Sequence, residues 1–171
     1  MTRRKMMSAV AIGIATFGSC YATRTVQAED DAALIKALGS AKVSLQQGLT
    51  ASQKEGQPIS AKFELEDGKL QLSVYTAKDG KFSELIVDHT TGNIAKTETI
   101  TEGEDLAEAK LQNAAMEKAK TDLKAAVDKS AAATTGSRAI SVTPALKDGR
   151  AIASVTLLVD QQLQTVEQPL E

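Results

Sequence analysis

The chain carries one histidine and one cysteine among its 171 residues, which limits the catalytic and metal chemistry open to it. Two-cysteine redox motifs, disulfide frameworks and zinc sites made of histidine and cysteine all need more of these residues. His89 is the single imidazole base, and a hydrolytic triad would have to place it beside a serine or threonine and an orienting carboxylate. It follows Asp88 in a segment of turn composition, so we expect an exposed turn histidine and no catalytic residue.

Three carboxylates lie close together at Glu64, Glu66 and Asp67. Their spacing lacks the Asp-x-Asp-x-Asp-Gly order and the distant glutamate of a calcium loop. Paired carboxylates for glycoside hydrolysis would need a cleft lined by aromatic rings, and aromatic residues make up only 3% of the chain. We expect a solvated strand face here, with no metal and no cofactor.

A helix followed by alternating strands would position these residues. Apolar residues spaced three and four apart predict a single helix from Asp31 to about Lys54. Period-two alternation then predicts antiparallel strands, with Asp67-Gly68 and Asp79-Gly80 as two-residue hairpin turns and a Thr-rich edge strand from Ile94 to Ile100. Because the strands are half apolar and half polar, we expect the helix on one face of the sheet and water on the other.

The aromatic residues are assigned to faces by the same alternation. Phe63 and Phe82 are expected on the buried face, and Tyr75 on the polar face. An amphipathic ring on a wet face would suit a partner contact. We favour cross-strand packing of Tyr75 against the stems of Lys62 or Glu64, and keep the partner contact as the alternative.

The second half of the mature sequence resembles the first. A shift of 81 positions aligns eight identical residues between 59–85 and 140–166, and it places Asp148-Gly149 on the Asp67-Gly68 turn. Thr101 to Glu104 fits a capping box that would open a helix reaching about Lys129. Pro144, aligned with Phe63, predicts a shorter or edge-located strand because proline cannot donate a ladder hydrogen bond. We predict an α+β protein of two tandem repeats, 29–101 and 102–171, each a helix packed on an antiparallel sheet.

The order of these elements resembles a PepSY domain. Members of that family typically close with an apolar residue, Asp, two variable residues and Thr-Gly, and Asp88, Thr91 and Gly92 match those positions. The second repeat lacks this turn and a fourth strand, so it is the shorter and less typical copy. The resemblance implies an exported, non-catalytic domain of the kind proposed to inhibit or regulate peptidases near the bacterial cell envelope. From the residues alone, we assign all three to turn geometry, with a partner contact as the alternative.

The N-terminus has the pattern of a secretory signal peptide. Three basic residues precede an uncharged run from Met6 to Phe17, and Val26-Gln27-Ala28 supplies small residues at the cleavage site. We predict a signal peptide over 1–28. Two alternatives are a retained membrane anchor, for which the run is poor in large apolar residues, and a lipoprotein acylated at Cys20, whose preceding Phe17 and Gly18 fit poorly.

Removal of residues 1–28 would leave 16 basic and 22 acidic residues, a net charge of −6, and no apolar run long enough to cross a bilayer. The acidic balance and the scarcity of aromatic rings argue against nucleic acid as a partner. We expect a periplasmic or secreted protein, without stable membrane insertion, that binds a protein partner such as a peptidase. The alternatives are a passive structural module of the envelope and a hydrolase that uses His89.

Processing of the N-terminus is directly testable. The intact mass of the exported protein should correspond to a chain that begins at Glu29, with no acyl group on Cys20, because the small residues end at Ala28. A mature N-terminus at an acylated Cys20 would contradict this prediction and make the protein membrane-tethered.

Overall fold

The computed structural model describes residues 23–171, with side chains from residue 29 onward. Most of the predicted signal peptide, including the run from Met6 to Phe17 and Cys20, lies outside the described residues. The helices are α1 (Thr23–Leu38), α2 (Leu45–Ser52), α3 (Gly103–Lys118) and α4 (Leu123–Ala132). The strands are β1 (Gln57–Glu66), β2 (Lys69–Lys78), β3 (Lys81–Val87), β4 (Ile94–Ile100), β5 (Arg138–Lys147), β6 (Arg150–Val159) and β7 (Gln162–Pro169).

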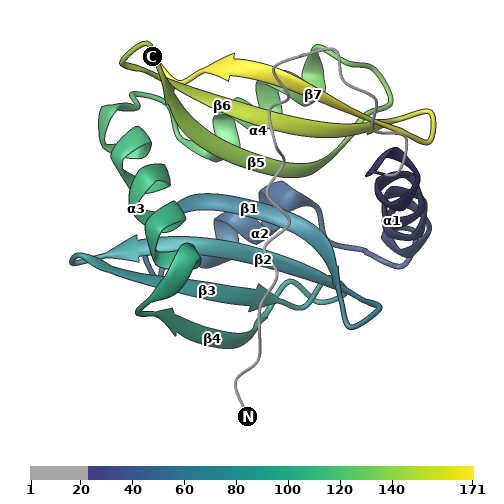
Figure 1. Ribbon diagram of the computed structural model, residues 1–171, viewed down its shortest axis with the longest axis horizontal. Helices are drawn as coiled ribbons and strands as arrows, with labels where there is room; N and C mark the ends of the chain where they lie inside the picture. Colours follow the sequence, from purple (N-terminus) through teal and green to yellow (C-terminus); the bar gives the residue numbers. More distant parts are fainter. Residues whose placement is uncertain (1–22) are drawn as a thin grey trace.

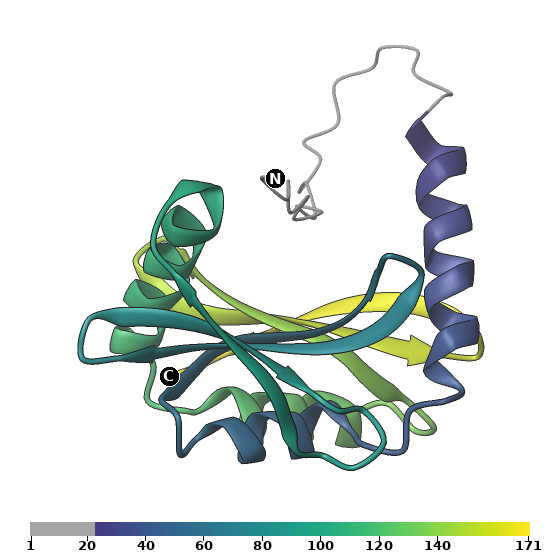
Figure 2. The same cartoon turned by 90° about the horizontal axis from the view of Figure 1, so that it is seen from below.

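All seven strands form one antiparallel sheet in the order β4-β3-β2-β1-β5-β6-β7, which confirms the predicted α+β class (Figure 1). The two halves of the sheet meet where β1 pairs with β5, at Ala61–Val142 and Lys62–Ser141. Helices α2 and α4 lie together under one face, while α3 and α1 rise from the other side at opposite ends of the sheet (Figure 2).

The predicted continuous helix from Asp31 to Lys54 is wrong. The chain leaves the helical path after Leu38, where Ser40 donates through both its backbone N–H and its hydroxyl to the carbonyl of Ala37. It re-enters a helix only after Ser44, whose side chain accepts from the Gln47 N–H while the Gln47 side chain accepts from the Ser44 N–H. This capping box gives α2 its own beginning, so α1 and α2 can leave in different directions.

The predicted helix from Glu102 to Lys129 also divides into two. Helix α3 ends at Lys118, and Asp122 caps α4 by accepting from the Ala125 N–H at 2.7 Å. The predicted capping box at Thr101 to Glu104 is absent: Glu102 occupies the N-cap without a side-chain capping bond. Gly103, at φ +77°, opens α3 instead.

The two faces of the sheet are both packed, so the prediction of one wet face is wrong over the centre of the sheet. Phe63 lies opposite Leu72 on the face that α2 covers, where a side chain added at Gly48 would meet Leu72. Tyr75 and Phe82 belong to the other face, because β2 and β3 pair Tyr75 with Glu84 and Ala77 with Phe82. Helix α3 packs on that face against β1, β2, β5 and β6, and both rings are buried. Phe63 and Phe82 therefore do not share a face.

Strand β5 is ten residues long, as is β1, so the prediction of a shorter strand at Pro144 is wrong. Pro144 is buried and lies opposite Ala153 of β6. Counting from the hairpin turn at Asp148-Gly149, the residues on either side of Pro144, Thr143 and Ala145, are the ones that form hydrogen bonds with β6. The nitrogen of Pro144 therefore points toward β1, beyond the two residues that pair there, and no ladder bond is lost.

Matching backbone features recur 81 positions apart. The register of β1 and β2 shifts between Pro58 and Ser60, and that of β5 and β6 shifts between Ala139 and Ser141. Four aspartates begin the two-residue turns with φ between 47° and 52°, namely Asp67, Asp79, Asp148 and Asp160. Such positive φ values at the first turn residue give the twist that tight antiparallel hairpins need.

The packing of Phe63 gives a stability prediction. Its ring is 3% exposed and carries the Arg138 guanidinium 5.4 Å from its centroid, so Phe63→Ala should cost about 3–5 kcal/mol of unfolding free energy. Pro144→Ala should cost only about 1–2 kcal/mol, because no ladder bond depends on the proline. Urea unfolding of both variants measures the difference. Equal midpoints for Phe63→Ala and wild type would contradict the assigned face.

Candidate functional site

The turn from Asp88 to Asn93 is held by its own first residue. One carboxylate oxygen of Asp88 accepts from the N–H groups of Thr90 at 2.7 Å and Thr91 at 2.9 Å. The bonds from the backbone N–H groups of Thr91 and Thr90 keep the pKa of Asp88 below its ordinary value. Gly92 has φ +80° and donates to the Asp88 carbonyl, which closes the turn. Asp88, Thr91 and Gly92 thus shape the backbone that precedes β4.

His89 is half-buried, so the prediction of an exposed turn histidine is wrong. Its carbonyl accepts from the N–H groups of Lys42 at 2.9 Å and Val43 at 3.0 Å, and this ties the turn to the linker between α1 and α2. Its Nδ1 is buried and has no hydrogen-bond partner within the described part of the chain. A triad histidine would donate from this nitrogen to a carboxylate.

The linker between α3 and α4 is tied down in the same way. The carbonyl of Leu170 accepts from the N–H groups of Lys120 at 2.6 Å and Thr121 at 3.0 Å. Leu170 is fully buried. Leu170 stands 81 positions after His89 and makes the same backbone contact with a different side chain. The carbonyl is therefore the group that fixes both linkers.

Tyr75 is not available on a wet face, so its alternative role as a partner anchor is wrong. It is 6% exposed, and its hydroxyl donates to Glu84 Oε1 at 3.2 Å. Burial, followed by the negative charge of Glu84, raises the pKa of Tyr75 far above its ordinary value. The Lys62 ammonium lies 5.9 Å from the ring centroid, in agreement with the favoured packing against Lys62.

Sequence reasoning missed the polar contacts around Tyr75. Glu84 is 5% exposed, and Ser60 beside Tyr75 donates to Gln112 of α3 at 2.7 Å. The alternation of Glu84 with apolar neighbours could have placed it opposite Tyr75. Nothing local could have shown that α3 packs beside Ser60 and Tyr75.

Of the three carboxylates at the β1–β2 hairpin, that of Glu64 is bound by neighbouring side chains, while Glu66 and Asp67 are exposed. Glu64 accepts from Lys62 Nζ at 2.6 Å and from the Ser73 hydroxyl at 2.7 Å, and Asp67 with Gly68 forms the turn. Asp148 and Gly149 form the corresponding turn of β5 and β6. Among the described residues, no group of three or more His, Cys, Asp or Glu side chains could hold a metal ion.

The outer edge of β7 offers backbone groups for pairing. Strands β4 and β7 are the two edges of the sheet. Gln162 pairs with Val159 across a two-residue turn, and Leu170 donates to the Ala151 carbonyl, so even-numbered residues of β7 bond toward β6. The N–H groups of Leu163, Thr165 and Glu167 consequently point away from the sheet. Pro169, which has no N–H, falls in this outward set, as proline does at sheet edges.

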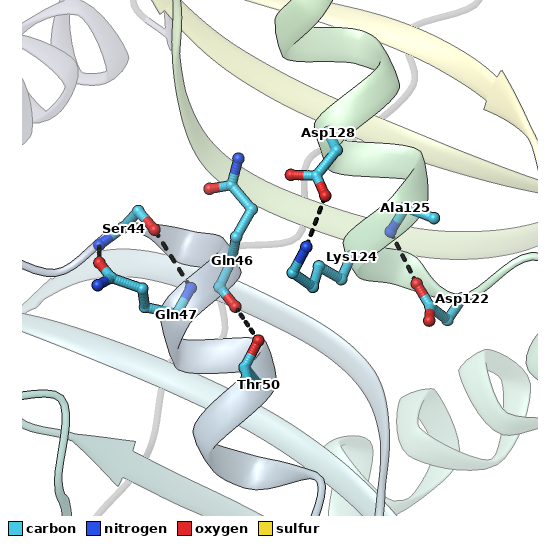
Figure 3. A network of polar contacts seen from close by, with 8 residues as sticks. All are labelled: Ser44, Gln46, Gln47, Thr50, Asp122, Lys124, Ala125 and Asp128. Atoms are coloured by element: carbon cyan, nitrogen blue, oxygen red, sulfur yellow. Dashed lines mark hydrogen bonds and ion pairs between the residues drawn. The ribbon is translucent and has the colours of Figure 1, made fainter.

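A cleft of about 350 Å³ opens between the end of α2, the start of β1 and the linker that joins α3 to α4. Its walls include Leu49, Gln53, Gln57, Met116, Asp122 and Lys124. Figure 3 shows the neighbouring helix starts: the Ser44–Gln47 cap on α2, the Asp122–Ala125 cap on α4, and Lys124 directed to Asp128. Since Lys124 Nζ lies 2.7 Å from Asp128, the lysine charge is already paired within α4.

No protein-family model, no curated protein and no solved structure matches this chain. Within residues 23–171, none of the helices combines the length and the apolar composition that a membrane span requires. The site is therefore interpreted from its own geometry.

The buried Tyr75 gives a pH prediction. In the unfolded chain a tyrosine ionises near about pH 10, whereas the folded protein holds Tyr75 protonated above that pH. The unfolded state then binds fewer protons, so this residue should lower stability by about 1.4 kcal/mol per pH unit above pH 10. Urea unfolding of wild type and Tyr75→Phe at pH 8 to 11 measures it. The difference in unfolding free energy between wild type and Tyr75→Phe should be constant up to about pH 9.5, and above it wild type should lose stability relative to the variant. A difference independent of pH would contradict the prediction.

Proposed function

We propose that this chain is an exported, non-enzymatic protein that binds another protein by adding a strand to the outer edge of β7, and that it regulates a peptidase or another envelope protein in this way. The observation that carries the proposal is the outward row of N–H groups at Leu163, Thr165 and Glu167 on an edge strand. Strand addition uses such main-chain groups for affinity and alternate side chains for selectivity. The resemblance to PepSY domains supports the peptidase as partner class.

The composition of the two edges favours β7 over β4. Strand β4 carries Lys96 in an ion pair with Glu98, and lysine on an edge discourages pairing with another chain. Strand β7 has no lysine or arginine, and its exposed residues are mainly glutamine and threonine. An incoming strand would meet one charged side chain on β7, that of Glu167, which is already paired with Lys147.

We further propose that residues 29–101 and 102–171 are two tandem PepSY-like repeats. In support, Ala61 pairs across the sheet junction with Val142, which stands 81 positions later, so the junction is centred on corresponding residues. The carbonyls of His89 and Leu170, also 81 apart, bind the two helix linkers alike. In this correspondence β7 matches β3, and β3 pairs with β4 on its outer edge. A partner strand on β7 would take the position that β4 has in the first half.

The proposal includes export to the periplasm or the medium with cleavage after Ala28. Helix α1 begins at Thr23, so cleavage would remove its first six residues. Leu34 and Leu38, which pack on the core, belong to the part that remains. The mature protein would therefore keep the contacts that hold α1 to the sheet.

The edge proposal can be tested with one substitution that removes an outward N–H group. Thr165→Pro removes such a group without breaking a bond to β6, while Thr165→Ala keeps it and loses the same contact with Thr156. Affinity capture from an envelope extract with each purified variant, followed by mass spectrometry, should recover a shared partner with wild type and Thr165→Ala. Thr165→Pro should lose at least about nine-tenths of that partner.

Hydrogen exchange on the captured complex supplies a second measurement. The amides of Leu163, Thr165 and Glu167 should exchange more slowly in the complex than in the free protein, because a new strand would accept their hydrogen bonds. A partner that binds Thr165→Pro normally and leaves these amides unprotected would contradict strand addition at β7.

A further inference from the structure

Arg138 links the two halves of the molecule. Its guanidinium donates to the carbonyl oxygens of Leu38 at 2.8 Å and of Ala41 and Val43 at 3.4 Å. The same group lies 5.4 Å from the centroid of the Phe63 ring. An arginine from the start of β5 thus satisfies the carbonyls of the α1–α2 linker and stacks on an aromatic face.

The corresponding place in the other half is the 350 Å³ cleft. Eighty-one positions before Arg138 stands Gln57, and seventy-eight positions after Leu38 stands Met116; both line this cleft. Gln57 has a shorter side chain without a charge, and Pro144 stands where Phe63 would be. An arginine therefore binds the carbonyls of the α1–α2 linker, while the cleft beside the α3–α4 linker is open to solvent. A volume of about 350 Å³ falls within the usual range of ligand pockets, about 300–1,000 Å³.

We propose that this cleft receives an arginine side chain from a protein partner, in the way that the α1–α2 linker receives Arg138. The inference rests on the correspondence of the two halves proposed above and is independent of strand addition at β7. The carbonyls of the α1–α2 linker accept a guanidinium, and of the counterpart residues Met116, Ala119 and Thr121, Met116 lines the cleft. Of the described side chains, the remaining guanidinium is that of Arg150, which is 76% exposed and lies 3.8 Å from Glu171, so it does not fill the cleft.

The cleft carries a carboxylate at a position that is neutral in the first half. Asp122 lines the cleft at the position where the first half has the neutral Ser44. One oxygen of Asp122 accepts from the Ala125 N–H at 2.7 Å, and a carboxylate keeps further acceptor positions beyond that bond. Lys124 would oppose a cation, but its ammonium is paired with Asp128. A planar guanidinium can bind a carboxylate and backbone carbonyls together, which a single ammonium does less well.

The test uses NMR titration of the purified ¹⁵N-labelled protein with three probes: N-acetyl-L-arginine methylamide, its neutral isostere N-acetyl-L-citrulline methylamide, and free L-arginine. The blocked arginine should cause saturable shifts confined to the amides of 116–124 and Gln57. The citrulline compound should bind at least about tenfold more weakly, because it lacks the charge. Equal binding of the two blocked probes, or no saturable shift at these amides, would overturn the proposal. Free arginine that binds more than about tenfold tighter than the blocked residue would make this a small-molecule site and overturn the assignment to a protein partner.

A matched pair of variants adds an independent check. Gln57→Arg places a guanidinium in the cleft from the chain itself and should abolish the shifts caused by the blocked arginine. Thr97→Arg adds the same charge at an exposed position of β4 that does not line the cleft, and should leave the shifts unchanged. If Gln57→Arg folds and still binds the probe like wild type, the assigned position is wrong. If Gln57→Arg does not fold, the comparison of probes on the wild-type protein decides.

Discussion

The molecule depends on a short antiparallel junction between two half-sheets. Strands β1 and β5 pair only at Ala61–Val142 and Lys62–Ser141, whereas each pairs with its hairpin partner along most of its length. Two ladder positions are a weak connection between units of this size, so the halves must also be joined by packing. Helices α2 and α4 contact each other beneath the junction, and α3 spans it by packing on β1, β2, β5 and β6. Arg138 adds a polar link from β5 to the α1–α2 linker.

Local patterns in the sequence predicted the strands and failed at the helices. Alternation and Asp-Gly pairs carry the information for a hairpin within a few residues, and the strands form where these patterns occur. The apolar spacing continues through Gly39 to Val43, so it gives no sign of a break. The amides freed by this break donate to the carbonyl of His89, which is distant in the sequence. A linker stabilised by such a contact leaves no local pattern, and the same holds for the Leu170 contact.

The candidate site shows the same division between local and tertiary information. The turn at Asp88 is held by the N–H groups of Thr90 and Thr91, and its residue types alone indicated a turn. Tyr75 was misplaced because alternation assigns a residue to a face and does not say what covers that face. Its burial depends on α3, which follows all four strands of the first half in the sequence. The Arg138 contacts and the cleft at Gln57 join segments from both halves, so no window of sequence contains them.

Under the proposed duplication, the two halves inform each other about binding. A position that is filled by the chain in one half and open in the other identifies what the open position accepts, because the surrounding backbone is the same. Strand β4 fills the edge of β3, while the outer edge of β7 is open; Arg138 fills one linker, while its counterpart beside Gln57 is open. The open edge of β7 leaves backbone N–H groups accessible, and the open cleft leaves the Asp122 carboxylate with acceptor positions beyond its capping bond. A single partner could occupy both sites only if its added strand reached β7 while its arginine reached the α3–α4 linker. The separation of the two sites on the molecule would therefore constrain the shape of that partner.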